Sequence, residues 1–265
     1  MPKLIVLKLG GSVITKKSEN KSEVNRENLD RLAKEISEAR KEKKFGLMVV
    51  HGAGPFGHVL AKKYELDKGL RNEKQLEGFA KTHQSMERLN EQVVGTLQKH
   101  GINAIAYQPS SLGLLKNKKI IQFPTGVIKG FLDLGMVPVS YGDVLVDLET
   151  GINILSGDHL VPYLAKELEA DRVIIATDVD GIYNGDPKTN KNAKPVKEIN
   201  SKNFKKIRIG GSKAVDVTGG MKRKVQELLE IAKLGIESQI IGAAKKGNLK
   251  MALLGNKKIG TIIKN

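Results

Sequence analysis

The chain of 265 residues is long enough for one large α/β domain or two lobes, and it contains no cysteine, which excludes disulfides, thiolate metal sites and cysteine nucleophiles. Hydrophobic residues make up 40% and charged residues 28%, and no apolar run approaches the roughly 20 residues that span a bilayer, so we expect a soluble, cytoplasmic protein with no membrane partner. The net charge of +16 favours polyanions, but the lysines are dispersed and only 4% of residues are aromatic, so we expect small phosphorylated ligands and no nucleic acid.

Strand-like apolar runs recur along the chain and are separated by segments long enough for helices. The runs cover residues 4–9, 47–50, 102–107, 137–140, 172–176 and 238–241. Helices are predicted from a cap at Asn25 to about residue 44, and over residues 73–99 and 220–234. This alternation is typical of an α/β fold in which helices cover both faces of a mainly parallel sheet and ligands bind beyond the carboxyl ends of the strands.

Two further segments have distinct patterns. Residues 144–146 and 152–155 are strand-like and flank a turn at residues 147–151, which predicts a β-hairpin. Residues 184–197 contain two prolines and many polar side chains, which predicts a flexible loop.

Residues 51–58, with the sequence His-Gly-Ala-Gly-Pro-Phe-Gly-His, lie between a predicted strand and a predicted helix. Gly52, Gly54 and Gly57 let the backbone approach an anion held by the unpaired N–H groups of the helix N-terminus, and His58 adds a hydrogen-bond donor. The six residues from Gly52 also match the dinucleotide pattern G-x-G-x-x-G. That interpretation needs a second strand ending in an acidic residue about 20 residues later, which is missing here.

Glycine-bearing turns follow four of the predicted strands, at residues 10–12, 52–57, 156–158 and 177–181. Each turn alone is compatible with an ordinary tight turn, but four of them at one edge of a sheet indicate several phosphates lying across that edge. The P-loop pattern and the protein kinase signatures are both absent. A kinase of either of those types is therefore excluded.

Charged residues accompany these turns. Lys8 ends the first predicted strand, where a cation must reach solvent or meet an anion. Asp158 and Asp178 lie in glycine turns, where a carboxylate either caps the turn or holds lysine ammonium groups or a magnesium shell. The three cations at residues 222–224 oppose the dipole of the helix that they begin, so this cluster costs stability unless it serves an anion.

Six motifs in chain order resemble the amino acid kinase superfamily and, within it, the archaeal isopentenyl phosphate kinases. They are Lys8-Leu9-Gly10-Gly11-Ser12, residues 51–58, Tyr141-Gly142-Asp143, Ser156-Gly157-Asp158, Thr177-Asp178-Val179-Asp180-Gly181 and Asp216-Val217-Thr218-Gly219-Gly220-Met221. The resemblance extends from residue 3 to about residue 262. His58 is the feature that separates this branch from the carboxylate kinases of the superfamily.

The resemblance implies an open αβα sandwich with a mainly parallel central sheet, and a homodimer. It implies a phosphotransferase that uses ATP and Mg²⁺ to convert isopentenyl phosphate to isopentenyl diphosphate by direct in-line transfer, in an alternative mevalonate route of isoprenoid biosynthesis. It also implies that residues 1–168 bind the phosphoryl acceptor and form the dimer, whereas residues 169–265 bind the nucleotide.

The resemblance also assigns roles to single residues. Lys8 and Lys224 would flank the transferred phosphoryl group, Lys17 would reach the phosphates, Asp158 would orient the lysines and His58 would contact the acceptor phosphate. The acceptor phosphate is expected at Gly11, Gly52, Ala53, Gly54, Gly57 and Gly157. For the isoprenoid tail we nominate Phe79, Thr82, Met86, Val144 and Ile154, which could equally be ordinary core residues. The nucleotide is expected at Lys8, Gly10, Ser12, Lys17, Thr177, Asp178, Gly181, Tyr183, Asp186, Pro187, Lys213, Gly220, Lys222 and Lys224. We name no residue as a metal ligand.

Two residues depart from the family pattern. Pro55 stands where a small residue is commoner and removes one backbone donor, and His159 follows Asp158 where relatives often have an acid or an amide, which puts the placement of Mg²⁺ in doubt. The nearest alternative function is a fosfomycin-type phosphonate kinase, which shares the histidine loop. A carboxylate or nucleoside monophosphate kinase and a non-catalytic nucleotide-binding regulator are further alternatives.

Overall fold

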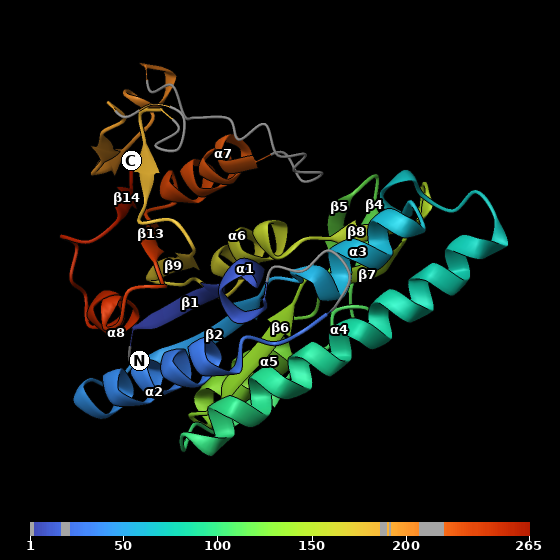
Figure 1. Cartoon of the computed structure of the whole chain (residues 1–265), viewed down its shortest axis with the longest axis horizontal. Coiled ribbons are helices and arrows are strands. Elements are labelled where there is room, and N and C mark those ends of the chain that lie inside the picture. The colour runs from blue at the N-terminus through green and yellow to red at the C-terminus, as the bar shows by residue number, and fades with distance from the viewer. Residues whose placement is uncertain (1–2, 17–21, 186–189, 191, 207–219) are drawn as a thin grey trace.

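The computed structural model describes residues 3–16, 22–185, 190, 192–206 and 220–265. In these residues a large eight-stranded sheet forms the centre of the molecule (Figure 1). Its strand order is β12-β14-β13-β9-β1-β2-β6-β3, and the bounds in that order are Glu198–Ile199, Thr261–Ile263, Glu237–Gly242, Arg172–Thr177, Leu4–Leu9, Gly46–His51, Val137–Tyr141 and Ala104–Ala106. All neighbouring strands are parallel except β13 and β14, so the predicted α/β fold with a mainly parallel sheet is confirmed.

Two smaller sheets accompany the large one. One has the order β5-β4-β7-β8, with bounds Lys119–Gln122, Leu114–Lys116, Asp143–Asp147 and Gly151–Leu155. Strands β7 and β8 form the hairpin predicted around residues 147–151. The other sheet pairs β10 (Ile182–Tyr183) with β11 (Pro195–Val196). Part of the segment that we expected to be a flexible loop is therefore a short ladder.

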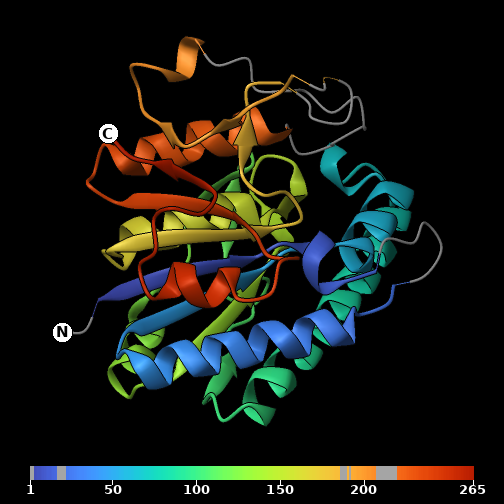
Figure 2. The same cartoon turned by 60° about the vertical axis from the view of Figure 1, so that its left-hand side comes forward.

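Helices cover both faces of the large sheet (Figures 1 and 2). The α-helices are α1 (Gly11–Ile14), α2 (Arg26–Glu42), α3 (Pro55–Lys63), α4 (Glu73–Lys99), α5 (Gly126–Asp133), α6 (Gly157–Glu167), α7 (Gly220–Ala232) and α8 (Asn248–Leu253). Two single turns of 3₁₀ helix span Leu66–Lys68 and Phe204–Lys206. In the part of the chain that the structure describes, no helix is long and apolar enough to cross a membrane.

The alternation of side chains along β1 divides the core into two layers. Leu7 packs on one face of the sheet in a cluster with side chains of α2, α4 and α8, whereas Val6 packs on the other face with side chains of α5, α6 and α7. Because side chains two residues apart in a strand point to the same face, Lys8 shares the face of Val6. The sheet thus directs Lys8 towards α6 and α7.

The predicted helix starts agree with the capping interactions. The side chain of Asn25 caps α2 by accepting a hydrogen bond from the amide of Asn28 at 3.2 Å, and Asn72 and Gln75 form a capping box at the start of α4. The predicted ends were less accurate. Helix α2 ends at residue 42 and α7 at residue 232, and the strand predicted over residues 102–107 is reduced to 104–106.

Candidate active site

The carboxyl ends of the central strands are joined by backbone hydrogen bonds. The amide of Gly10, after β1, donates to the carbonyl of Ala176 in β9 at 2.8 Å. The amide of Gly52, after β2, donates to Leu9 at 2.9 Å. Strand β1 lies between β9 and β2, so the chain continues from β1 to one side of the sheet and later reaches the other side. The glycine turns therefore lie at the topological switch point of the sheet. Open α/β sheets bind ligands at such a point.

The two glycine turns touch so closely that a side chain would not fit between them. A Cβ atom on Gly11 would lie 2.3 Å from the amide nitrogen of Gly54, and a Cβ atom on Gly52 would lie 2.7 Å from the amide nitrogen of Gly11. Gly54 also has a φ of +51°, which favours glycine. Glycine is therefore required here for backbone contact, and bare amides line the edge of the sheet.

Lys8, Asp158 and Lys224 come together from three elements. Nζ of Lys8, at the end of β1, lies 2.6 Å from Oδ1 of Asp158 in the first turn of α6. Nζ of Lys224, in the first turns of α7, lies 3.6 Å from the same oxygen. Gly157 completes the arrangement, since a Cβ atom there would lie 3.4 Å from Cε of Lys8. Two cations from opposite halves of the chain thus share one carboxylate.

The charges at this cluster perturb one another. Lys8 is only 6% exposed, and burial lowers the pKa of its ammonium group, although Asp158 opposes this shift. Burial acts to raise the pKa of Asp158, but the ammonium groups of Lys8 and Lys224 outweigh it and the pKa is lowered. The carboxylate is therefore charged at neutral pH, and it neutralises one of the two cations that face it. The remaining positive charge favours an anion.

The two histidines of residues 51–58 have different environments. His58 is exposed in the first turn of α3, and its backbone amide donates to the carbonyl of Gly54 at 3.1 Å. His51 is fully buried, stacks on Tyr141 with ring centroids 5.2 Å apart, and lies within hydrogen-bond distance of the Gly52 carbonyl and the Asn90 side chain. Burial lowers the pKa of His51 to about 4. Of the two imidazoles that we expected on this turn, that of His58 is exposed and that of His51 is buried.

The residues nominated for the isoprenoid tail are divided between two clusters. Phe79, Val144 and Ile154 pack together in a small apolar cluster with Ala61, Tyr64, Leu66 and Ile152. Met86 is fully buried in the core under α4, and the hydroxyl of Thr82 is buried without a hydrogen-bond partner among the described residues. The small cluster joins α3 to the β7–β8 hairpin, and within it Val144 is buried whereas Phe79 and Ile154 are half-buried.

Four of the residues nominated for the nucleotide lie outside the described residues, namely Lys17, Asp186, Pro187 and Lys213. Thr177 is buried at the end of β9, and Asp178 follows it at the surface. Gly181 and half-buried Tyr183 follow next, whereas Ser12 on α1 and Lys222 on α7 are exposed. The amide of Ala243, after β13, donates to Thr177 at 2.7 Å and closes this edge of the sheet.

Two polar contacts in this region were not predicted from the sequence. Thr15 donates a hydrogen bond to the carbonyl of Gly11 at 2.6 Å and packs against Gly54, which supports both glycine turns. His159 and Glu227 contact each other at 3.0 Å beside Asp158 and Lys224. The only available signal was that Glu227 lies three residues after Lys224 on a predicted helix, so both face the same side.

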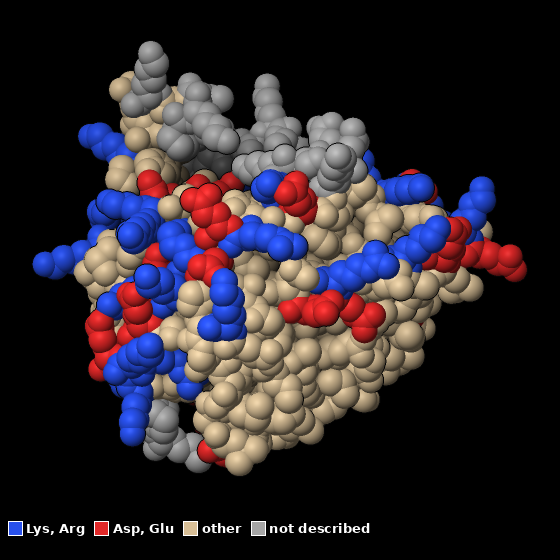
Figure 3. All heavy atoms as spheres, turned by 60° about the horizontal axis from the view of Figure 1, so that its bottom comes forward, with Lys and Arg blue, Asp and Glu red and all other residues tan. Residues whose placement is uncertain are grey.

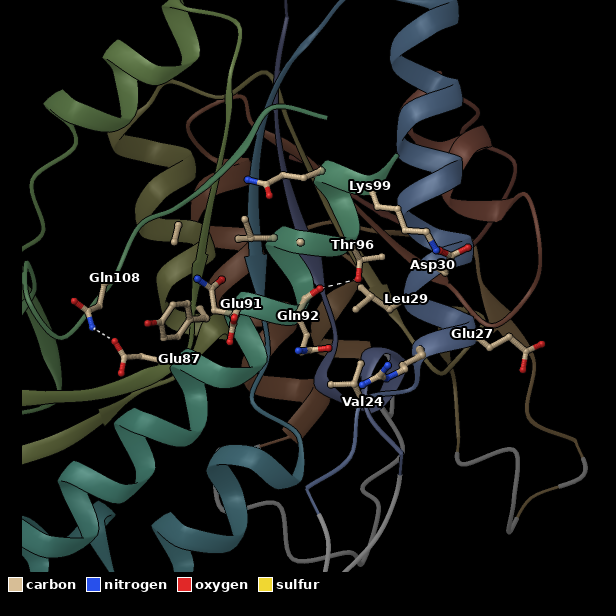
Figure 4. A pocket seen from close by; sticks show the side chains of 17 residues that line it. Val24, Glu27, Leu29, Asp30, Glu87, Glu91, Gln92, Thr96, Lys99 and Gln108 are labelled. Carbon is tan, nitrogen blue, oxygen red and sulfur yellow. Dashed lines mark hydrogen bonds and ion pairs between the residues drawn. The ribbon is translucent and has the colours of Figure 1, made fainter. Parts of the chain in front are cut away.

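A separate hollow of about 1140 Å³ lies between α2 and α4 (Figure 4). Its lining includes Glu27 and Asp30 of α2 and Glu87 and Glu91 of α4, and it contains neither Lys8, Asp158 nor Lys224. These four carboxylates outnumber the two cations of the lining, Arg26 and Lys99, which disfavours a phosphate there. We therefore place the candidate active site at the sheet edge and not in this hollow.

The fold and the site define a class of protein. It is an α/β phosphotransferase in which glycine turns, Lys8, Asp158 and Lys224 lie at the carboxyl edge of the sheet and from which the P-loop pattern is absent. The model of the amino acid kinase family matches residues 3–242. The isopentenyl phosphate kinase of Methanothermobacter thermautotrophicus is 41% identical over 98% of each chain, and that of Methanocaldococcus jannaschii is 40% identical over 95% of each. A solved structure of an isopentenyl phosphate kinase matches with a TM-score of 0.86 and 39% identity, and covers 98% of this chain and 100% of that one. The chain belongs to the amino acid kinase family and, within it, to the isopentenyl phosphate kinases.

Proposed function

We propose that this chain transfers the γ-phosphoryl group of ATP to isopentenyl phosphate and releases isopentenyl diphosphate and ADP, a step of isoprenoid biosynthesis by the alternative mevalonate route. The observation that carries the proposal is the convergence of Lys8 and Lys224 on Asp158 beside the glycine turns. The family relationship supports the choice of acceptor.

The reaction needs positioning and charge neutralisation more than covalent help. A terminal phosphate oxygen of isopentenyl phosphate attacks the γ-phosphorus of ATP, and the bond from that phosphorus to the bridging oxygen of ADP breaks. Because this oxygen is already ionised near neutral pH, no catalytic base is required. The enzyme must hold two polyanions in line and offset their repulsion as charge spreads over the equatorial oxygens.

We assign this neutralisation to the lysine cluster and the glycine amides. Lys8 and Lys224 flank the transferred phosphoryl group, and Asp158 holds their ammonium groups in place. In the described residues no group of three or more His, Asp or Glu side chains is arranged to hold a metal ion. When ATP carries Mg²⁺ on its phosphates, the ion would offset part of their negative charge.

The two halves of the chain take different substrates in this proposal. Residues 1–168 hold the acceptor, with its phosphate at His58 and the Gly52–Gly54 turn and its tail against the Phe79, Val144 and Ile154 cluster. Residues 169–265 hold the nucleotide near Thr177 and the start of α7. The position of the lysine cluster between these halves supports the division, because α6 belongs to the first half and α7 to the second.

A panel of acceptors tests the proposal. Coupled release of ADP from ATP is measured with isopentenyl phosphate, fosfomycin, glutamate and UMP, and the first is expected to give the largest kcat/KM. His58→Ala is expected to lower kcat/KM for isopentenyl phosphate about 10- to 100-fold, the value of a hydrogen bond to a charged group, while the exposed Lys62→Ala on the same helix has no effect. Preference for fosfomycin would identify a phosphonate kinase, and ATP binding without acceptor-dependent ADP release would identify a regulator.

We also propose that the chain forms a homodimer in the cytoplasm. Figure 3 brings forward the lower side of Figure 1 and shows a broad area with few charged side chains, which is unusual for a chain with a net charge of +16. Val127 on α5 is 57% exposed. Leu134, the residue that follows the last residue of α5, is 78% exposed. A second copy of the chain would cover them. Light scattering is expected to give a dimer mass, and Leu134→Glu combined with Val127→Glu is expected to give a monomer.

A further inference from the structure

A second polar contact joins α6 to α7 beside the lysine cluster. Nε2 of His159, the residue after Asp158 on α6, lies 3.0 Å from Oε1 of Glu227 on α7. Nε of Arg223 lies 3.1 Å from the same oxygen, and the guanidinium of Arg223 also contacts the imidazole of His159. His159 and Glu227 are both shielded, with side chains 23% exposed. These two side chains are therefore partly shielded, whereas that of Arg223 is 48% exposed.

The tautomer of His159 decides which of its two contacts is a hydrogen bond. With a proton on Nε2, the imidazole donates to Glu227, which also accepts from Arg223. Without that proton, Nε2 accepts from the guanidinium of Arg223, which in turn donates through Nε to Glu227. In both arrangements His159 of α6 is linked to the charged pair on α7.

The first turn of α7 needs such a link. It contains Lys222 and Arg223, and Lys224 follows directly, so three cations near the positive end of the helix dipole favour fraying of the turn. Glu227 lies one turn further along, where its carboxylate pairs with Arg223 and shares the helix face of Lys224. If this carboxylate were lost, Glu227 would no longer attach the start of α7 to α6. The 3.6 Å contact between Lys224 and Asp158 would remain.

We propose that His159 and Glu227 are positioning residues for phosphoryl transfer, which clamp α7 to α6 and thereby hold Lys224 beside Asp158. This proposal rests on the proposed function, because the purpose of the clamp is to fix Lys224 at the transferred phosphoryl group. It also explains why the histidine at residue 159, a departure from the family pattern, faces α7 in this chain. The clamp connects the acceptor half of the protein to the nucleotide half.

Hydrogen exchange of the full-length protein tests the clamp without any substrate. In Glu227→Ala and His159→Ala, amides of residues 225–229 in α7 are expected to exchange about tenfold faster than in the wild type. His159→Gln keeps a side-chain donor and acceptor and is expected to restore slow exchange. Glu230→Ala is the matched control, since Glu230 lies on the exposed side of the same helix and pairs with Lys233. Equal exchange in Glu227→Ala and Glu230→Ala would overturn the proposal.

A double-mutant cycle with Lys224 tests whether the clamp acts through that lysine. Glu227→Ala is expected to lower kcat about tenfold in the wild type, with KM for isopentenyl phosphate changed by less than about twofold, and to have almost no effect in Lys224→Ala. Equal losses in both backgrounds would show that Glu227 does not act through Lys224. If the wild type fails to phosphorylate isopentenyl phosphate, the proposed function falls, and hydrogen exchange still decides whether the clamp exists.

Discussion

Nζ of Lys8 and Oδ1 of Asp158 lie 2.6 Å apart at the carboxyl end of the central strand β1. Lys8 is almost completely buried, so this carboxylate is what allows an ammonium group to remain at the end of an apolar strand. Lys224 approaches the same oxygen from α7. One aspartate thus holds two cations at the place where we expect the phosphoryl group to be transferred.

Asp158→Asn is predicted to impair both activity and stability. The amide does not hold the ammonium groups, so kcat is expected to fall about 10²- to 10³-fold, as for the loss of other groups that organise transition-state charge. The free energy of unfolding is expected to fall by about 3 kcal/mol, because Lys8 is left buried without a counter-ion. Steady-state kinetics and urea denaturation measure the two effects. Asp133→Asn, at the exposed end of α5, is the control, and equal behaviour of both variants would contradict the role of Asp158.

Gly11→Ala is predicted to separate the two glycine turns. Its Cβ would meet the amide nitrogen of Gly54 at 2.3 Å, so the backbone of one turn must move and kcat/KM is expected to fall more than about 100-fold. Gly95→Ala in α4 adds the same methyl group where no atom lies within 4 Å, and it is expected to stabilise the protein by about 0.5–1 kcal/mol with unchanged kinetics. Kinetics of Gly11→Ala resembling those of Gly95→Ala would show that the contact between the turns is dispensable.

His51 is predicted to make stability depend on pH. Its pKa is about 4 when buried and 6.5 when unfolded, so between these values the unfolded chain binds a proton that the folded protein does not. The free energy of unfolding is therefore expected to decrease by about 3 kcal/mol as the pH falls from 6.5 to 4, and the contribution stays constant below pH 4. His51→Gln removes this titration. Urea denaturation at several pH values should show a steeper decrease for the wild type, and parallel curves would contradict the buried neutral imidazole.

The layout of the fold could be predicted from periodicity because its long elements have strong local patterns. The apolar runs of β1, β2 and β9 and the capped helix α4 are visible in the sequence. The short elements β4, β5 and α8 were missed, because they depend on tertiary contacts. Strands β4 and β5, for example, meet at residues 117 and 118, whose amides donate to the buried carboxylate of Asp147 in β7. Such a long-range contact leaves no local pattern.

The candidate site could likewise be predicted where its residues lie in local sequence patterns, but not where they meet through long-range contacts. Glycines and cations after strands indicated a phosphate edge, and the structure brings Lys8, Asp158 and Lys224 together there. The contact between His159 and Glu227 joins residues far apart in the chain, and neither residue lies in a strand-to-helix glycine turn. The sequence therefore indicated which groups could meet phosphate, but not which groups hold them in position.

The most direct test of the account is kcat/KM for isopentenyl phosphate, measured by ADP release with the wild type and with Lys224→Ala. Lys224 is less buried than Lys8, so this variant is expected to fold and to reveal the charge contribution alone. The account predicts acceptor-dependent turnover by the wild type and a loss of about 10²- to 10³-fold in the variant. Absence of wild-type turnover, or a variant within about threefold of the wild type, would contradict it.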